Sequence, residues 1–188
     1  YGLPHLRGLY ELSDPDYEGR YSVPVFWDKQ TKKIVNNESA EIIRFLNNAF
    51  QELATHPEVD LAPEALLAGI DEVNEWIYPS INNGVYRCGF ATTQEAYEEA
   101  FNDLFAALDR LEAFLEGKRF LVGEQLTEAD IRLFVTLIRF DPVYFGHFKC
   151  NKRSLTSYKN IWLHTRRLYA NQAIKGTVSI PHIKRHYY

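Results

Sequence analysis

Asn36, Asn37, Glu38 and Ser39 lie at the start of a predicted helix, where they could together hold an α-amino acid group. The free backbone N–H groups and the dipole of a helix N-terminus favour an anion, and the Ser39 hydroxyl can add a donor. A ligand carboxylate would suit this position, while the Glu38 carboxylate could take an adjacent ammonium group. The structural alternative is that Asn36 or Asn37 caps the helix and that Glu38 favours its dipole.

A proline lies between two valines just upstream, in the strand-like stretch SVPVFW. Proline removes one ladder hydrogen bond, so Pro24 must lie at an edge or a bulge, or adopt the cis form at a tight turn. Either arrangement can leave the backbone N–H and C=O of Val23 free to pair with an extended, peptide-like ligand. The structural alternative is a proline that protects a sheet edge from aggregation.

The apolar pattern changes along the chain from the period of a strand to that of a helix. We expect a short helix and a loop within residues 1–20, a hairpin over 21–27 and 33–35, and a helix from about Glu38 to Glu52. Beyond a linker with two prolines every predicted element is helical, over about 63–80, 93–116, from Thr127 onward, 157–170, and a last turn or helix after Pro181. Because two strands alone are marginal in water, we expect upstream chain to complete the sheet.

Two of the predicted helices carry capping signals. Thr92 and Glu95 predict a capping box at the start of the helix 93–116, and Gly117 predicts its end. Thr127, with Asp130 three residues later, predicts a capping box in which the shorter Asp side chain takes the place of the usual Glu or Gln. The helix that follows is apolar round most of its circumference, which predicts a place at the centre of a bundle.

Composition and charge restrict the class of protein. The 188 residues contain no apolar run of 18 or more and no secretory signal, so no membrane partner is expected. Two cysteines are too few for a disulfide framework and favour a reducing compartment, most simply the cytoplasm. Residues 149–188 hold nine of the 21 Lys and Arg and no Asp or Glu. This basic segment could bind nucleic acid or an anionic ligand, or pack against the acidic remainder, which we favour because no nucleic-acid motif is present.

Several of these stretches together resemble a known family. The segment SVPVFWDKQTKKIVNNESAEIIRF is similar to the second half of the glutathione-binding, thioredoxin-like domain of glutathione transferases, with the proline in the cis form. The helical remainder resembles their C-terminal domain, and LTEADIRL resembles the capping segment of its central helix. Three longer motifs, INNGVYRCGFATTQEAYEEA, TLIRFDPVYFGHFKCNK and HIKRHYY, resemble the glutathionyl-hydroquinone reductases, or Xi class, near the omega class. The resemblance runs from about residue 9 to 188.

The resemblance implies an α+β, two-domain glutathione transferase fold. An incomplete thioredoxin-like domain would occupy residues 1–53, a linker 54–62, and an all-helical domain 63–188. Glutathione is the implied co-substrate, a quinone or hydroquinone conjugate the implied second partner, and a homodimer, with contributions from the helices 63–80 and 93–116, the implied assembly.

The resemblance also assigns roles to residues. Val23, beside Pro24, would pair its backbone with the cysteinyl part of glutathione, while Glu38 and Ser39 would hold the γ-glutamyl end. Tyr86 and Tyr187 would face the hydroquinone, because a phenol can stack on an aromatic ring and hydrogen-bond to a quinol oxygen. From the residues alone, Tyr86 is a core tyrosine after a helix-ending Asn-Gly pair, and Tyr187 is a surface residue near a chain end.

The chain departs from the family at the nucleophile. These enzymes use a cysteine at the N-terminus of the first helix of the glutathione domain, where the dipole lowers the thiol pKa. Neither Cys88 nor Cys150 matches that position, and both are expected to be structural thiols. No metal site is expected, because His147 and Cys150 supply only two ligands.

Three hypotheses follow from the sequence. The first is a glutathione-dependent reductase of glutathionyl-hydroquinones, incomplete here at the N-terminus and also at the C-terminus, whose nucleophile lies upstream. The second is a cysteine-less protein that keeps the transferase fold for binding or partnership without catalysis. The third, a helical domain that binds nucleic acid through the basic segment, rests on charge alone.

Overall fold

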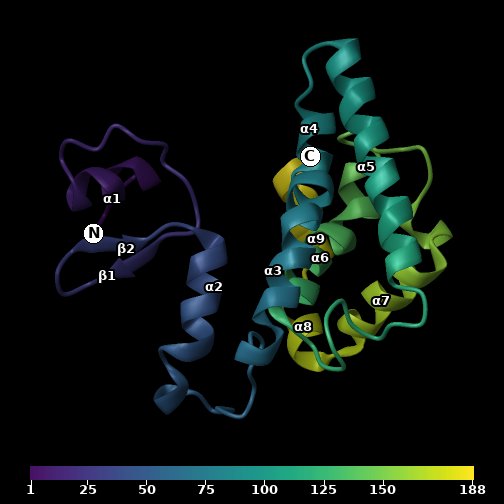
Figure 1. Ribbon diagram of the computed structural model, residues 1–188. Coiled ribbons are helices and arrows are strands. Elements are labelled where there is room, and N and C mark those ends of the chain that lie inside the picture. Colours follow the sequence, from purple (N-terminus) through teal and green to yellow (C-terminus); the bar gives the residue numbers. More distant parts are fainter. The chain divides into compact units, whose positions relative to one another are not determined.

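The computed structural model describes every residue from Tyr1 to Tyr188, and the chain forms two compact units. Unit 1, Tyr1–Asp60, contains the hairpin, and unit 2, Leu61–Tyr188, contains only helices and turns (Figure 1). None of the helices combines the length and the hydropathy that a membrane crossing needs.

Unit 1 is built from one hairpin and two helices. Its elements, in chain order, are α1 (Leu6–Ser13), β1 (Phe26–Asp28), β2 (Lys33–Asn36), α2 (Ser39–Asn48) and the 3-10 turn η1 (Gln51–Leu53). The two strands pair antiparallel, with Trp27 opposite Ile34. The predicted hairpin and the predicted short first helix are therefore confirmed.

The first strand is shorter than predicted. Residues 21–25 do not join the sheet, because Pro24 has no N–H to donate to a ladder. The buried side chain of Tyr10 holds this segment instead. Its hydroxyl donates to the carbonyl of Ser22 (2.7 Å) and accepts from Nδ2 of Asn37 (3.1 Å). One tyrosine of α1 thus fixes both the approach to Pro24 and the approach to α2.

The helix α2 ends at Asn48, earlier than predicted. Asparagine is a poor helix former, and the side chain of Asn47 donates to Oδ1 of Asp60 (2.7 Å), which ties the last turn to the end of the unit. Phe45 packs edge-on against Phe26 of β1, with ring centroids 4.9 Å apart. This contact holds the helix against the hairpin.

Unit 2 is a helical bundle with a continuous apolar core. Its helices are α3 (Leu67–Ile77), α4 (Gly84–Gly89), α5 (Gln94–Phe114), α6 (Glu128–Arg139), α7 (Lys159–Ala170), α8 (Gln172–Gly176) and α9 (Ile180–Tyr187). Four short turns join them, η2 (Glu64–Leu66), η3 (Tyr78–Asn82), η4 (Phe140–Tyr144) and η5 (Leu155–Ser157). The prediction of a last helix after Pro181 is confirmed, whereas α4 and α8, too short for a clear periodic pattern, were not predicted.

The helix α6 packs against both α3 and α7, as its apolar circumference predicted. Leu133, Phe134 and Leu137 are buried in the core. Val135, however, is 43% exposed, so one face of α6 lies outside the core.

The helix predicted over 63–80 is divided into η2, α3 and the π-helical turn η3. In η3 the N–H of Asn83 donates to the carbonyl of Tyr78 (2.8 Å), five residues earlier instead of four. The chain then continues directly into α4, so the prediction that Asn83 and Gly84 end the helix is wrong. Gly84 instead allows a close approach of Leu104, whose Cδ1 would lie 3.3 Å from an added Cβ.

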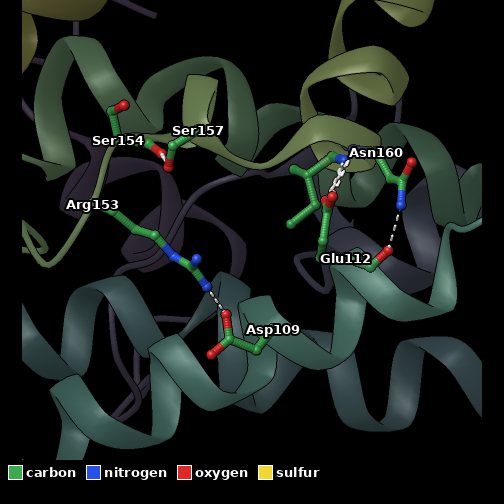
Figure 2. A network of polar contacts seen from close by, with 7 residues as sticks. Asp109, Glu112, Arg153, Ser154, Ser157 and Asn160 are labelled. Atoms are coloured by element: carbon green, nitrogen blue, oxygen red, sulfur yellow. Dashed lines mark hydrogen bonds and ion pairs between the residues drawn. The ribbon is translucent and has the colours of Figure 1, made fainter.

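A polar network joins α5 to the start of α7 (Figure 2). The Glu112 carboxylate accepts from the backbone N–H groups of Asn160 (2.9 and 3.0 Å) and Ile161 (2.9 Å). Nearby, Arg153 pairs with Asp109. Because free N–H groups at a helix N-terminus favour an anion, a carboxylate from α5 serves as the cap of α7.

The capping box predicted at α6 is confirmed. The backbone N–H and the hydroxyl of Thr127 both donate to Oδ2 of the buried Asp130 (2.9 and 3.0 Å), and the Leu121 N–H donates to its Oδ1 (2.8 Å). Burial raises the pKa of Asp130, and these hydrogen bonds oppose that rise. His164 Nε2 lies 3.6 Å from the same Oδ1, but burial lowers the pKa of His164 to about 4, so this contact is no ion pair near neutral pH.

The capping box predicted at α5 from Thr92 and Glu95 is wrong by one residue. The N-cap is Thr93, whose Oγ1 accepts from the N–H of Ala96 (3.2 Å). The predicted end is confirmed, since Gly117 has a φ of +70° just past the helix.

Replacing the true cap should destabilise the bundle. Thr93→Ala is expected to lower the free energy of unfolding by about 1 kcal/mol, because the Ala96 N–H loses its side-chain acceptor. Thr92→Ala is the matched control and should change the stability by less than about 0.5 kcal/mol. Urea unfolding followed by circular dichroism measures both, and equal losses for the two variants would contradict the assignment of Thr93.

Candidate functional site

The segment around Val23 presents a free backbone in unit 1. The peptide bond between Val23 and Pro24 is cis, as the resemblance implied. The Val23 side chain is 75% exposed, and its backbone N–H and C=O take part in no hydrogen bond of the structure. A ligand with an extended backbone could therefore pair with Val23 without displacing another partner.

The N-terminus of α2 is also free. Glu38 is its N-cap residue, and no side chain caps the helix. Asn36, one of the two predicted caps, accepts from the Glu38 N–H through Oδ1 (2.7 Å), while the Asn37 amide binds Tyr10. The N–H groups of Ser39 and Ala40 consequently keep no acceptor, and the Glu38 and Ser39 side chains are exposed. This terminus can accept an anion beside a carboxylate.

Three tyrosine hydroxyls meet in unit 2, which we call the tyrosine cluster. The hydroxyl of Tyr86 in α4 lies 2.7 Å from that of Tyr187 in α9 and 3.3 Å from that of Tyr144 in η4. The hydroxyls of Tyr144 and Tyr187 are 3.2 Å apart. The two tyrosines that the sequence singled out, 101 residues apart, are thus in hydrogen-bond contact. The sequence did not indicate Tyr144 as a site residue, although Tyr144 lies in one of the three motifs that carry the resemblance.

Aromatic rings surround the tyrosine cluster. Phe148 stacks on Tyr144 with ring centroids 5.3 Å apart and an angle of 14° between the rings. Phe90, which is 71% exposed, stacks on Tyr86 at 6.1 Å. Gly89 is required beside them, since an added Cβ would lie 2.3 Å from Cδ1 of Phe148. An exposed ring next to the hydroxyls offers a stacking partner to a flat ligand.

The phenols of Tyr86 and Tyr144 keep their protons near neutral pH, because burial raises the pKa of both. Burial raises the pKa of Tyr144, and the contacts with Tyr187 and Tyr86 raise it further. Burial also raises the pKa of Tyr86, whereas the hydrogen bond from Tyr144 and the charge of Arg139 act in the opposite direction. Neutral phenols can donate hydrogen bonds to an oxygen that gains negative charge, and each phenol can in turn be steadied by the other two.

The two cysteines lie against each other in the core of unit 2. Cys88 and Cys150 are both buried, and Sγ of Cys150 is 3.8 Å from the carbonyl oxygen of Phe148. The hydrogen bond from Cys150 lowers the pKa of the Cys88 thiol, while the contact with Cys88 and burial raise the pKa of Cys150. Because both side chains are buried, neither thiol is open to a ligand that approaches from solvent.

The helical bundle with a capped central helix, following a hairpin–helix unit, defines the two-domain glutathione transferase fold, which confirms the predicted fold class. The family model described as "Glutathione S-transferase, C-terminal domain" matches residues 94–167. The crystal structure of glutathione transferase Xi 1 from Trametes versicolor superposes with a TM-score of 0.95 at 56% identity, over 100% of this chain and 66% of that chain.

Curated relatives that are similar in sequence carry names from the same family. Glutathionyl-hydroquinone reductase PcpF of Sphingobium chlorophenolicum is 50% identical over 187 residues, 100% of this chain and 59% of the relative. A second relative, glutathionyl-hydroquinone reductase YqjG of Escherichia coli (strain K12), is 53% identical over 97% of this chain and 56% of the relative. The glutathione-bound structure of YqjG gives a TM-score of 0.94. The chain therefore belongs to the glutathione transferase family, in its Xi class, and spans somewhat under two thirds of the length of these relatives.

Proposed function

We propose that the protein containing this chain is a glutathione-dependent reductase of glutathionyl-hydroquinones. The observation that supports it best is the contact between the hydroxyls of Tyr86 and Tyr187, since the two motifs that carry these residues lie far apart in the chain and each resembles a hydroquinone-facing segment of the family. Two relatives about half identical in sequence bear the name glutathionyl-hydroquinone reductase, and one has been solved with glutathione bound.

In this proposal unit 1 binds glutathione. The backbone of Val23, beside Pro24, pairs with the cysteinyl part of the tripeptide. The free N–H groups and the Ser39 hydroxyl at the start of α2 hold the γ-glutamyl carboxylate, and Glu38 pairs with its ammonium group. The carboxylate and the ammonium group of the γ-glutamyl end then each have a partner in unit 1.

The reaction exchanges sulfur partners. A cysteine thiolate attacks the glutathione sulfur of the conjugate, the carbon–sulfur bond breaks, and the ring carbon takes a proton, giving the hydroquinone and an enzyme–glutathione disulfide. A second glutathione then attacks that disulfide and leaves as glutathione disulfide, which restores the thiol. We assign the thiolate to a residue outside the 188 of this chain, because Cys88 and Cys150 are buried in unit 2.

The tyrosine cluster serves the leaving hydroquinone. Negative charge develops on the ring and its oxygens as the carbon–sulfur bond breaks, and the Tyr86 and Tyr187 hydroxyls donate to such an oxygen. Tyr144 fixes the two hydroxyls through its own contacts with both. Phe90 supplies a stacking surface for the ring.

Further features belong to the same proposal. Residues 1–53 form the part of the thioredoxin-like domain present here, 54–62 the linker and 63–188 the helical domain. The protein is cytoplasmic, in keeping with two free cysteines, and homodimeric, which light scattering of the purified protein measures. The alternative is a cysteine-less member that binds glutathione and has lost catalysis.

Turnover separates these two functions. The full-length protein should release menadiol from glutathionyl-menadione and form one glutathione disulfide per turnover. Binding of glutathione with no detectable turnover would instead support the cysteine-less alternative.

The glutathione assignment predicts a specific loss of binding. Glu38→Gln in the full-length protein is expected to weaken glutathione binding roughly fivefold, because the ammonium group loses an exposed ion-pair partner. Glu41→Gln is the matched control, since Glu41 lies on the same helix but accepts from Nδ2 of Asn36 (2.7 Å). Isothermal titration calorimetry measures both, and equal affinities would contradict the role of Glu38.

A further inference from the structure

The ring of Phe148 packs against every member of the tyrosine cluster. It stacks on Tyr144 and lies edge-on to Tyr86, with ring centroids 5.3 Å apart, and to Tyr187, with ring centroids 5.8 Å apart. Phe90, by contrast, contacts only Tyr86 among the three phenols. The phenols come from α4, η4 and α9, so one buried ring joins three elements that are distant in the sequence.

The positions of the three hydroxyls depend on the tilt of their rings. A phenol oxygen lies at the far end of its ring, so a small tilt displaces the oxygen more than any other atom of the side chain. Stacked and edge-on aromatic pairs have preferred geometries. Because Phe148 makes such a contact with each tyrosine, its own position restricts all three tilts at once. The hydroxyls, 2.7–3.3 Å apart, have little room to move before their hydrogen bonds are lost.

A left-handed turn in the backbone holds Phe148 in place. Lys149 has a φ of +58°, a conformation that a residue other than glycine adopts only where its surroundings impose it. Phe148 and Cys150, on either side of the exposed Lys149, are both buried. The N–H of Cys150 donates to the carbonyl of Tyr144 (3.0 Å). The turn thus returns the chain to η4 and directs the Phe148 ring into the cluster.

Tyr97 of α5 closes this turn from the other side. Its hydroxyl donates to the carbonyl of Lys149 (2.7 Å), 52 residues further along the chain. Burial raises the pKa of Tyr97, so the phenol keeps the proton that it donates near neutral pH. The Tyr97 ring packs on Phe101 of the same helix, with ring centroids 5.5 Å apart. The turn is therefore tied to the long helix of the bundle.

We propose that Phe148 is the positioning residue of the tyrosine cluster, and that the left-handed turn at Lys149, closed by Tyr97, sets the place of its ring. Phe148 acts through the tilt of Tyr86 and Tyr187. The consequence for turnover rests on the proposed function, whereas the consequence for the geometry of the cluster does not.

A fluorine label tests the geometry without any turnover. The full-length protein carries 3-fluorotyrosine in place of Tyr187, and its fluorine NMR resonance reports the surroundings of that ring. Phe148→Leu should shift or broaden the resonance. Phe105→Leu is the matched control, since Phe105 is fully buried in α5 and has its ring contacts with Phe101 and Phe140. An unchanged resonance in Phe148→Leu, or an equal change in both variants, would overturn the proposal.

The same label tests the turn. Lys149→Gly and Lys149→Val both remove the ammonium group, but only the β-branched valine disfavours a positive φ. The resonance should therefore move in the valine variant and stay in the glycine variant. Tyr97→Phe should also move it, whereas Tyr169→Phe, at a half-buried tyrosine of α7, should not. Equal responses within either pair would remove the turn from the proposal.

Kinetics with glutathionyl-menadione tests the consequence for turnover. Phe148→Leu should lower kcat about tenfold and change KM far less, because the hydroxyls are displaced while the ring-binding surface remains. In the Tyr86→Phe/Tyr187→Phe background, where both donors are absent, Phe148→Leu should lower kcat by less than about twofold. A purely structural role would give the same factor in both backgrounds and would contradict the proposal. Absence of turnover in the parent protein would contradict the proposed function, and the fluorine resonance would still decide the role of Phe148.

Discussion

Asp130→Ala is expected to lower the free energy of unfolding of the helical unit by about 3–5 kcal/mol. The substitution leaves three donors without an acceptor in the core, namely the Leu121 N–H and the N–H and hydroxyl of Thr127. Each unsatisfied buried donor costs about 1–3 kcal/mol, and a domain has only about 5–15 kcal/mol of net stability. Urea unfolding followed by circular dichroism at a helical wavelength measures the loss.

Asp103→Ala is the matched control for this experiment. Asp103 lies on α5, about half exposed, and its carboxylate pairs with Arg87, which also pairs with Glu99. An exposed ion pair contributes at most about 1 kcal/mol, so the control should remain close to the parent protein. A similar small loss for Asp130→Ala would show that the hydrogen bonds around Asp130 do not organise the bundle.

Tyr187→Phe is expected to reduce kcat for glutathionyl-menadione about 100-fold in the full-length protein, if the proposed function holds. The ring and its packing on Tyr144 remain, so only the hydroxyl that contacts Tyr86 is removed. Because the hydroxyl acts on charge that develops during bond breaking, KM should change far less than kcat. Steady-state kinetics of menadiol release measures both constants.

The neighbouring tyrosine provides the control. Tyr188→Phe makes the same chemical change at a residue that is 71% exposed and outside the hydroxyl cluster, so its kcat should stay within about twofold of the parent. Tyr86→Phe combined with Tyr187→Phe should lose little more than either alone, because the two hydroxyls act as a unit. Equal kcat values for Tyr187→Phe and Tyr188→Phe would contradict the role assigned to Tyr187.

Local signals in the sequence predicted the local parts of the fold. The Thr127 and Asp130 box was predicted correctly, because its partners lie three residues apart and one turn suffices to bring them together. At α5 the same reasoning chose Thr92 over Thr93, since two adjacent threonines offer equally good caps and only the backbone conformation decides. For Pro24 the residues left the cis form as one of several alternatives, and the resemblance selected it.

Parts that depend on packing between distant residues could not be predicted. Tyr144 meets Tyr86 and Tyr187 across 58 and 43 residues, and no pattern in its own neighbourhood indicates that contact. The exposed face of α6 at Val135 depends likewise on which neighbours are present. The strand predicted over 21–27 is longer than the observed β1, because the apolar alternation runs through Pro24 while the missing N–H of this residue prevents pairing there.

The two π-helical turns make the positions of the tyrosines in the cluster depend on the exact number of residues in each turn. Besides η3, the turn η4 has the Phe145 N–H bonded to the carbonyl of Phe140 (2.8 Å), again one residue further back than in an α-helix. Each turn acts as a one-residue insertion, and one residue corresponds to about 100° of helix rotation. Because η3 leads directly into α4, deleting a single residue there would swing Tyr86 to another side of its helix with no change of side-chain chemistry. Insertions and deletions, more than substitutions, are thus the changes by which such a bundle could gain or lose its phenol pair.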